Sequence, residues 1–174
     1  MSVDPLAIRD KMKLWLEDDG YPVRIIEDKR TYFTLGVEHP TLHLPFTIGQ
    51  RLGQKDRINI LGTLKVSDEH KQQLKRMGED ELSNFIWMLE LTLLTNDVQF
   101  EMSFSNHILT QPSKPVQVPD QIIIAEAIWH DGLIKDNLMR RIRQTVKGMQ
   151  LSLLKLDMML GTQTLKEQHS RYHT

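Results

Sequence analysis

The pattern of apolar and polar residues is most regular in the last long stretch of the chain, from Asp131 to Gly161. No proline interrupts residues 133–160, and 28 residues make a helix of about 42 Å at 1.5 Å per residue. Asp131 is a residue type that caps helix starts, and Gly161 stands where a C-terminal glycine is common. The pattern therefore predicts a long C-terminal helix that needs cover from the rest of the chain or from another chain.

The predicted helix has two apolar sides in its second half. One side is a seam whose apolar residues recur at spacings of three and four, as expected for packing on a sheet or helix. The seam consists of Leu138, Ile142, Val146, Met149, Leu153, Leu156 and Leu160. The opposite side carries Leu151, Leu154 and Met158, and each of these would forgo about 1.5–3 kcal/mol if left in water. We therefore expect these three residues to contact a second copy of the chain; the chain's own first helix is the alternative cover.

The first part of the chain predicts one helix followed by a β region. Asp4 and Pro5 suit a helix start, and apolar residues with helical spacing continue to Asp18. Apolar and polar residues then alternate, which indicates half-buried strands. Strands are expected at residues 23–27, 31–38, 42–48 and 58–66, the first two as a hairpin. Pro45 lacks a backbone donor, so the third strand is expected at a sheet edge. Residues 49–56 are expected to form a polar loop, and Gly62 suggests a bulge or a close approach.

A short polar helix from Asp68 to Met77 and a stronger helix after Gly78, capped by Asp80, are expected next. The stronger helix has a wide apolar stripe that includes Leu82, Leu89 and Leu93. It has further apolar residues outside that stripe, so it is expected to be largely buried. These further residues are Trp87, Met88, Leu91 and Leu94.

Strands are then expected at residues 98–104 and 122–129, and Ile122-Ile123-Ile124 suggests burial on both sheet faces. The element order α-β-β-β-β-α-β-β-α predicts an α+β fold with a mainly antiparallel sheet.

Length and composition favour a soluble globular protein. The 174 residues are expected to form one α+β domain over residues 1–161, with a polar tail at 162–174. The net charge of −1 and the pI near 6.7 do not favour nucleic acid or an anionic membrane as partner. The absence of cysteine excludes disulfides and cysteine nucleophiles. No signal peptide or membrane span is recognised, so a cytoplasmic location is expected.

The histidines do not form a recognisable metal site. His39 and His43 belong to the string H-P-T-L-H, but Pro40 places them at a loop rather than on a helix, so a surface role is favoured. His169 and His173 are four residues apart in the polar tail, with no carboxylate placed to complete a ligand set. We therefore assign no metal ligand and no cofactor.

No catalytic motif is present. The glycines of G-Q-R-L-G, Gly49 and Gly53, are typical of a plain connection between strands. Asp131 is better explained as a helix cap than as a partner of His130. The remaining enzyme hypothesis is a hydrolase or ligand-binding site on the sheet. In that hypothesis a concave site brings together His43, Glu101, Glu126 and His130.

Basic residues form a stripe on the first half of the long helix. Arg140, Arg143 and Lys147 share one side, with Arg141 nearby. The stripe could bind phosphates, which leaves nucleic-acid binding as a further alternative, but a solvated face is favoured at this net charge. The P-x-x-P string at residues 112–115 is interpreted as a loop rather than as a ligand for an aromatic groove.

The element order resembles the type III secretion chaperone-like fold over residues 4–161. The stretches D-P-L-A-I-R-D-K-M-K-L-W-L-E-D-D-G-Y and I-I-I-A-E-A-I-W-H-D-G-L are also similar to a family of small uncharacterised prokaryotic proteins, many of them archaeal, with this fold. The resemblance implies homodimerisation and protein binding, and it transfers no functional residue. The leading hypothesis is therefore a non-enzymatic, homodimeric, chaperone- or adaptor-like interaction module with a protein client.

Overall fold

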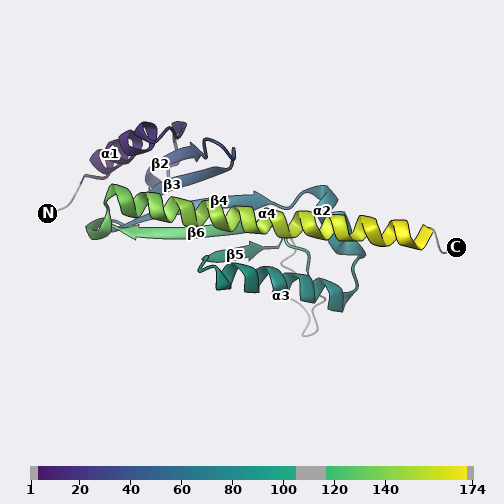
Figure 1. Ribbon diagram of the computed structural model, residues 1–174. Coiled ribbons are helices and arrows are strands. Elements are labelled where there is room, and N and C mark those ends of the chain that lie inside the picture. The colour runs from purple at the N-terminus through teal and green to yellow at the C-terminus, as the bar shows by residue number, and fades with distance from the viewer. Residues whose placement is uncertain (1–3, 105–116, 172–174) are drawn as a thin grey trace. The chain divides into compact units, whose positions relative to one another are not determined.

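The computed structural model describes residues 4–104 and 117–171. The chain divides into two compact units. Unit 1 contains Met1–Thr63 and Ile124–Lys147, and unit 2 contains Leu64–Ile123 and Gly148–Thr174. The elements are α1 (Pro5–Asp18), β1 (Val23–Ile26), β2 (Thr31–Glu38), β3 (Pro45–Arg51), β4 (Arg57–Lys65), α2 (Asp68–Arg76), α3 (Glu79–Thr95), β5 (Phe100–Ser103), β6 (Gln121–Trp129), a 3-10 turn (His130–Gly132) and α4 (Lys135–Arg171), as Figure 1 shows.

The strands form one six-stranded sheet in the order β1-β2-β3-β4-β6-β5. The pairs from β1 to β4 are antiparallel neighbours in sequence, because short turns can connect only antiparallel strands. The predicted α+β fold, with its mainly antiparallel sheet and long C-terminal helix, is confirmed.

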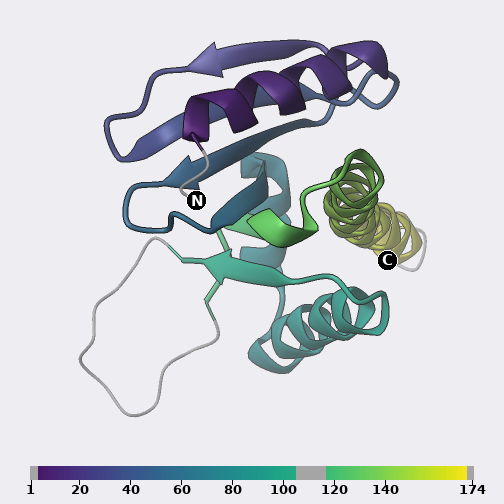
Figure 2. The ribbon, with the colours of Figure 1, turned by 90° about the vertical axis from the view of Figure 1, so that its left-hand side faces the viewer.

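One face of the sheet in unit 1 is covered by helices. The Asp4 carboxylate accepts the amide of Leu6 at 3.0 Å and caps α1, which packs against β1 and β2 (Figure 2). From α1, Ile8, Met12 and Leu16 enter the same core as the first half of α4. The buried core consists of Ile8, Met12, Leu16, Phe33, Leu35, Val37, Phe46, Ile48, Ile58, Ile60, Ile128, Leu138, Met139, Ile142 and Val146. The other face of these strands carries mostly small and polar residues, with Ile26 and Leu61 among them.

The third strand differs from the prediction. β3 lies between β2 and β4, so the expected edge position is wrong. Pro45 is the first residue of the strand, opposite Glu38, where a missing amide costs the least. The strand begins there because His43 turns the chain with φ 51°. Gly49 is a strand residue rather than a loop residue.

The bulge that was expected at Gly62 does not lie at that residue. Gly62 pairs with Phe46 within a continuous register, and a shift in pairing between β2 and β3 lies at Thr31 to Phe33 instead.

Unit 2 contains α2, α3, β5, the start of β6 and the second half of α4. Ser67 caps α2 by accepting the amide of His70 at 3.2 Å, and the Lys71 ammonium lies 2.6 Å from the Asp120 carboxylate. α3 begins after Gly78 without a side-chain cap, so the expected cap Asp80 is wrong. Asp80 instead lies in the first turn, where its charge suits the positive end of the helix dipole. In β6, Ile122 and Ile124 are buried while Ile123 is half-buried.

Both predicted ends of the long helix are wrong. His130–Gly132 form a 3-10 turn and α4 starts at Lys135, so Asp131 is not its cap. The Asn137 amide closes this corner by donating to the Gly132 carbonyl at 2.8 Å. At the other end the helix continues through Gly161 to Arg171. A helical glycine costs only about 1 kcal/mol relative to alanine, which neighbouring good helix formers can offset.

Candidate functional site

Helix α3 is apolar on two opposite sides. At about 100° per residue, Leu82, Leu89 and Leu93 lie within about 40° of one another, and these three are buried. Trp87 and Leu91 lie on the opposite side and are exposed to solvent, with 57% of Trp87 accessible. The exposed apolar set of the helix comprises Trp87, Met88, Leu91 and Leu94. The prediction that this helix is largely buried is therefore wrong.

The second half of α4 has the same double character within unit 2. Met149 and Leu156 are buried, whereas Leu154 is 55% and Met158 57% exposed on the opposite side. Leu151 is half-buried. In the seam, Leu138, Ile142 and Val146 are also buried, Leu153 is half-buried, and the side chain of Leu160 is outside the described part. Ser152, which the predicted seam does not include, is fully buried, and its hydroxyl is satisfied there by donating to the Gly148 carbonyl at 2.9 Å.

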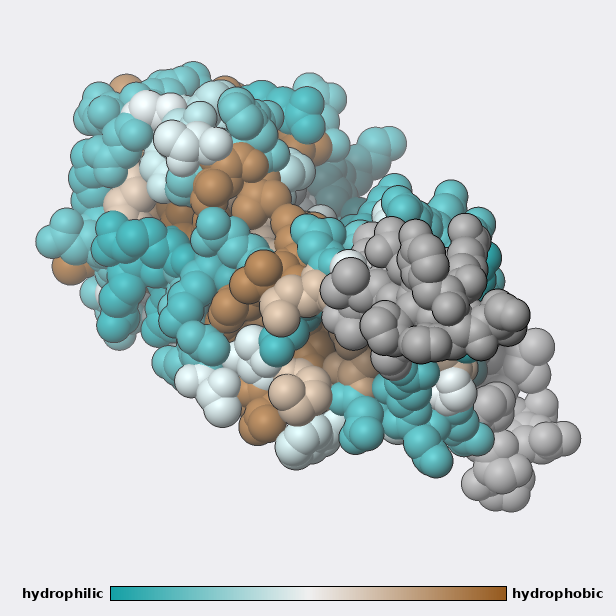
Figure 3. All heavy atoms as spheres, turned by 45° about the vertical axis from the view of Figure 1, so that its right-hand side comes forward, coloured by the Kyte–Doolittle hydropathy of each residue, from teal (hydrophilic) through white to brown (hydrophobic). Residues whose placement is uncertain are grey.

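These two helices lie side by side in both ribbon views (Figures 1 and 2). We call the exposed set made by Trp87, Met88, Leu91 and Leu94 of α3 with Leu154 and Met158 of α4 the outer helix surface. One face of the molecule has hydrophobic residues gathered between hydrophilic ones (Figure 3). Contiguous exposed apolar residues mark interaction sites more often than single exposed ones do.

The residues of the enzyme hypothesis each have a separate local environment. The His43 ring lies 2.7 Å from the Glu38 carboxylate. The His130 ring lies 3.2 Å from the side-chain nitrogen of Gln50. Glu101 is exposed on β5. Among the described residues, no hydrogen bond or ion pair joins any two of His43, Glu101, Glu126 and His130.

Glu126 belongs to a structural ion pair. Its side chain is 1% exposed and accepts from the Arg141 guanidinium at 2.7 Å. Glu126 lies on β6 and Arg141 on α4, so the pair ties the first half of the helix to the sheet. A buried carboxylate held in this way is paired with a counter-charge and is not available as a free acid or base.

His39 is engaged in a turn rather than in a metal site. Its Nδ1 atom accepts from the amides of Thr41 and Leu42, at 3.4 Å and 3.3 Å. Its ring meets Tyr21 edge-on, with 5.7 Å between the ring centres. Over the described ranges, no group of three or more histidine or acidic side chains is placed to hold a metal ion.

One polar row was not predicted from the sequence, because Asp157 is far in the chain from its other members, Ser67 and His70. The Ser67 hydroxyl lies 2.6 Å from His70 Nδ1, and His70 Nε2 lies 3.4 Å from the Asp157 carboxylate. The Ser67 oxygen also accepts the His70 amide as the cap of α2. The row therefore has a direct structural role: it fixes the start of α2 and connects it to α4 within unit 2.

The three residues of the predicted basic stripe, Arg140, Arg143 and Lys147, are all exposed. Arg140 also donates to the Asn137 side chain at 3.0 Å. Arg141, which lies next to the stripe, is half-buried and donates to Glu126 instead. Burial raises the pKa of Tyr21, and the positive charge of Arg143 opposes that rise.

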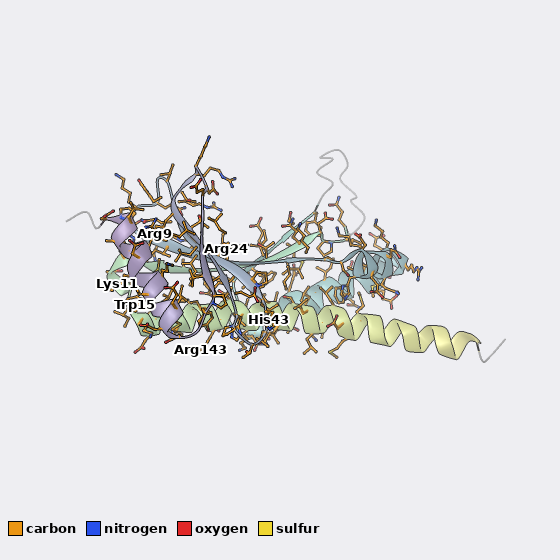
Figure 4. All side chains as sticks on the ribbon, turned by 90° about the horizontal axis from the view of Figure 1, so that it is seen from above. Arg9, Lys11, Trp15, Arg24, His43 and Arg143 are labelled. Carbon is orange, nitrogen blue, oxygen red and sulfur yellow. The ribbon has the colours of Figure 1, made fainter. Side chains whose placement is uncertain are left out.

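On α1, the Lys11 ammonium lies 4.8 Å from the centre of the Trp15 ring; Figure 4 labels these two residues and Arg143. The P-x-x-P string at residues 112–115 and the side chains of His169 and His173 lie outside the described part of the structure.

The helix-free face of the sheet in unit 1 contains two shallow hollows. The first, of about 420 Å³, is lined among others by Arg24, Glu38 and Thr63. The second, of about 580 Å³, is lined among others by Arg51 and Asn59. The sequence analysis missed this face because it contains none of the residue patterns that signal catalysis.

The comparisons with known proteins agree with the fold. The model of the family described as "Uncharacterized conserved protein (DUF2299)" matches residues 8–156. The chain belongs to this family. An uncharacterised protein from Methanothermobacter thermautotrophicus has a similar crystal structure, with a TM-score of 0.73 and 24% identity over 87% of this chain and 99% of that chain. No curated protein matches the chain.

The family and this structural neighbour support the expected resemblance to small uncharacterised prokaryotic proteins. Neither description names an activity. Within the described residues, no helix has both the length and the apolar character needed to cross a bilayer.

Proposed function

We propose that this protein is a non-enzymatic protein-interaction module that forms a homodimer through the outer helix surface. The observation that carries the proposal is the second apolar side of α3, where Trp87, Leu91 and Leu94 are exposed although the opposite side of the same helix is buried. Each large apolar side chain that a partner covers contributes about 1.5–3 kcal/mol before the costs of association.

A second copy is a suitable partner because one two-fold contact covers both helices at once. In a two-fold interface the same patch is used on both subunits. The outer helix surface supplies apolar side chains from α3 and from α4, so each copy presents and receives the same kind of surface. Tryptophan and methionine are also enriched in the centres of protein interfaces.

The wider role that we propose is binding of a protein client by this dimer, as in a chaperone or adaptor. The resemblance of the element order to the type III secretion chaperone-like fold supports this role by analogy only.

Light scattering after size-exclusion chromatography at micromolar concentration tests the dimer. The wild-type chain is expected to elute at twice the mass of the 20.3 kDa chain. Trp87→Glu and Leu154→Glu are expected to shift it to a single chain, because a carboxylate cannot be desolvated at the centre of an apolar contact. Gln72→Glu adds the same charge at an exposed position of α2 and is expected to leave the dimer intact. A wild-type monomer, or a dimer that tolerates both substitutions, refutes the proposal.

A further inference from the structure

The helix-free sheet face of unit 1 has a floor of small residues. The two hollows adjoin, since Ile26, Thr47 and Leu61 line both of them. Gly36 pairs with Thr47 and Thr34 pairs with Gly49 across β2 and β3. The volumes of about 420 Å³ and 580 Å³ lie in the usual range of sites for small molecules.

Gly36 has no side chain, and this leaves room for the Arg24 side chain to lie across the first hollow. A Cβ at that position would lie 2.8 Å from Cδ1 of Ile26 and 3.0 Å from Nε of Arg24. The two side chains of β1 therefore lie flat over β2. Among the described residues, the Arg24 side chain makes no hydrogen bond or ion pair. Glu38, the carboxylate that lines this hollow, is 2.7 Å from the His43 ring instead. Figure 4 labels Arg24 and His43 on the ribbon.

Arg51 occupies the corresponding place in the second hollow. The carboxylate there, Asp28, is held by Arg30 through the backbone amide at 2.9 Å and two guanidinium contacts at 3.0 Å. Over the described ranges, the Arg51 side chain makes no hydrogen bond or ion pair. Each hollow thus has one guanidinium whose donors are unused, while its carboxylate already has another partner.

The two guanidinium groups flank a floor of small residues with apolar side chains beside it. Arg24, Gly36, Thr47 and Leu61 form one row across β1 to β4, and Arg51 follows Thr47 by four residues on β3, which is about 13 Å along an extended strand. Between this row and Arg51 lie Thr34 and Gly49, with Ile26 paired to Thr34 at their side. The face therefore presents two cations separated by small residues, with apolar contacts available from Ile26 and Leu61, which line both hollows.

We propose that this face binds a small elongated dianion whose two acidic groups are joined by an apolar chain about 10 Å long, as in a long-chain α,ω-dicarboxylate. Guanidinium groups bind carboxylates through paired hydrogen bonds, and an arginine that is already laid across its floor loses little freedom on binding. A single nucleic-acid strand fits less well, because Phe46, the aromatic residue that lines the first hollow, is buried in the core with 3% exposed and is not available to stack on bases. The proposal is independent of the dimer.

Titration of ¹⁵N-labelled full-length protein with decanedioate tests the site. The amide signals of Gly36, Gly49 and Thr47 are expected to shift with decanedioate. Decanoate, which has one acidic group, and butanedioate, which is too short, are expected to bind at least about 10-fold more weakly. Arg24→Met and Arg51→Met are each expected to weaken decanedioate binding about 10- to 100-fold. The control Arg140→Met, on α4, is expected to bind as the wild type does.

The variants also separate binding from folding. Gly36→Val keeps both arginines but displaces Arg24 and Ile26, so it is expected to lose the site while retaining the wild-type circular dichroism spectrum. If Arg24→Met does not fold, Arg24→Lys keeps the charge, loses the paired geometry and is expected to weaken binding. Equal binding of decanoate and decanedioate, indifference to the Arg24 and Arg51 variants, or no shift at millimolar decanedioate each overturns the proposal. Trp87→Glu is expected to leave decanedioate binding unchanged, so failure of the dimer does not affect this result.

Discussion

Trp87 and Leu89 are two residues apart on α3 and lie on opposite sides of it. Leu89 is completely buried, whereas 57% of Trp87 is exposed. Two residues span about 200° of a helix, so one apolar sequence supplies both the core contact and a second apolar side. The outer helix surface follows from this relationship, and so does the proposal that another chain covers it.

The two sides of α3 should differ in their contribution to folding. Leu89→Ala is expected to lower the free energy of unfolding by about 2–5 kcal/mol, because it leaves a cavity in the core of unit 2. Leu91→Ala removes the same atoms from the exposed side and is expected to cost less than about 0.5 kcal/mol in the monomer. Urea unfolding at nanomolar concentration measures both. Equal losses would contradict the two-sided description of the helix.

Trp87 should report dimer formation directly. Trp15→Phe and Trp129→Phe leave it as the only tryptophan, since the chain has three. Its fluorescence maximum is expected to move to shorter wavelength as protein concentration rises from nanomolar to micromolar, because the partner removes water from the indole. Leu154→Glu is expected to abolish the change. An emission maximum that is independent of concentration in both proteins would show that Trp87 does not lie in the interface.

The ion pair between Glu126 and Arg141 should be sensitive to the loss of one partner. Arg141→Met leaves a carboxylate that is 1% exposed without its counter-charge, which costs about 3–5 kcal/mol. Chemical denaturation should show this loss, and a second substitution, Glu126→Leu, is expected to restore most of it. The control Arg143→Met, two residues away and exposed, is expected to change the unfolding free energy by less than about 0.5 kcal/mol. Similar losses for Arg141→Met and Arg143→Met would show that the pair is not stabilising.

Asp28 should titrate below its ordinary range. Hydrogen bonds from the Arg30 side chain, then from the Arg30 amide, lower the pKa of Asp28 from 3.8, and the charge of Arg51 acts in the same direction. A lowered folded-state pKa gives a stability contribution that is present above the unfolded pKa of about 3.9 and is lost as the pH falls through the folded value. Titration followed by the carboxyl ¹³C shift is expected to show this, and Arg30→Ala is expected to raise the pKa toward 3.8. An unchanged pKa in that variant would exclude Arg30 as the main cause.

Local signals in the sequence were sufficient for much of the fold. The Asp4 cap and the following helical period specified α1, and alternation of apolar residues specified β2 and β4, because periods of 3.6 and 2 differ clearly. The same signals were misleading at Pro45 and Gly161. A proline is tolerated at the first position of an inner strand, so Pro45 did not place β3 at the sheet edge. A glycine is tolerated in a long helix, so Gly161 did not end α4.

The candidate sites were only partly predictable. The sequence pointed to Leu151, Leu154 and Met158 on the long helix, and the interface there remains a prediction. It did not predict the exposed apolar side of α3. The pattern shows how many residues of a helix are apolar, but not which of its sides are buried by other elements. It also missed Arg24 and Arg51, whose importance depends on strand register and on the carboxylates that Arg30 and His43 engage.

The sequence by itself determined which segments of this protein become helices and strands, since that depends on residues near one another in the chain. It also determined that the C-terminal helix has apolar residues on two sides. Only the tertiary structure decided that Leu89 is covered while Trp87 is exposed. It alone decided that Arg24 lies across Gly36 in an open hollow. Burial and pairing of this kind depend on residues that are distant in the chain, and no local pattern encodes them.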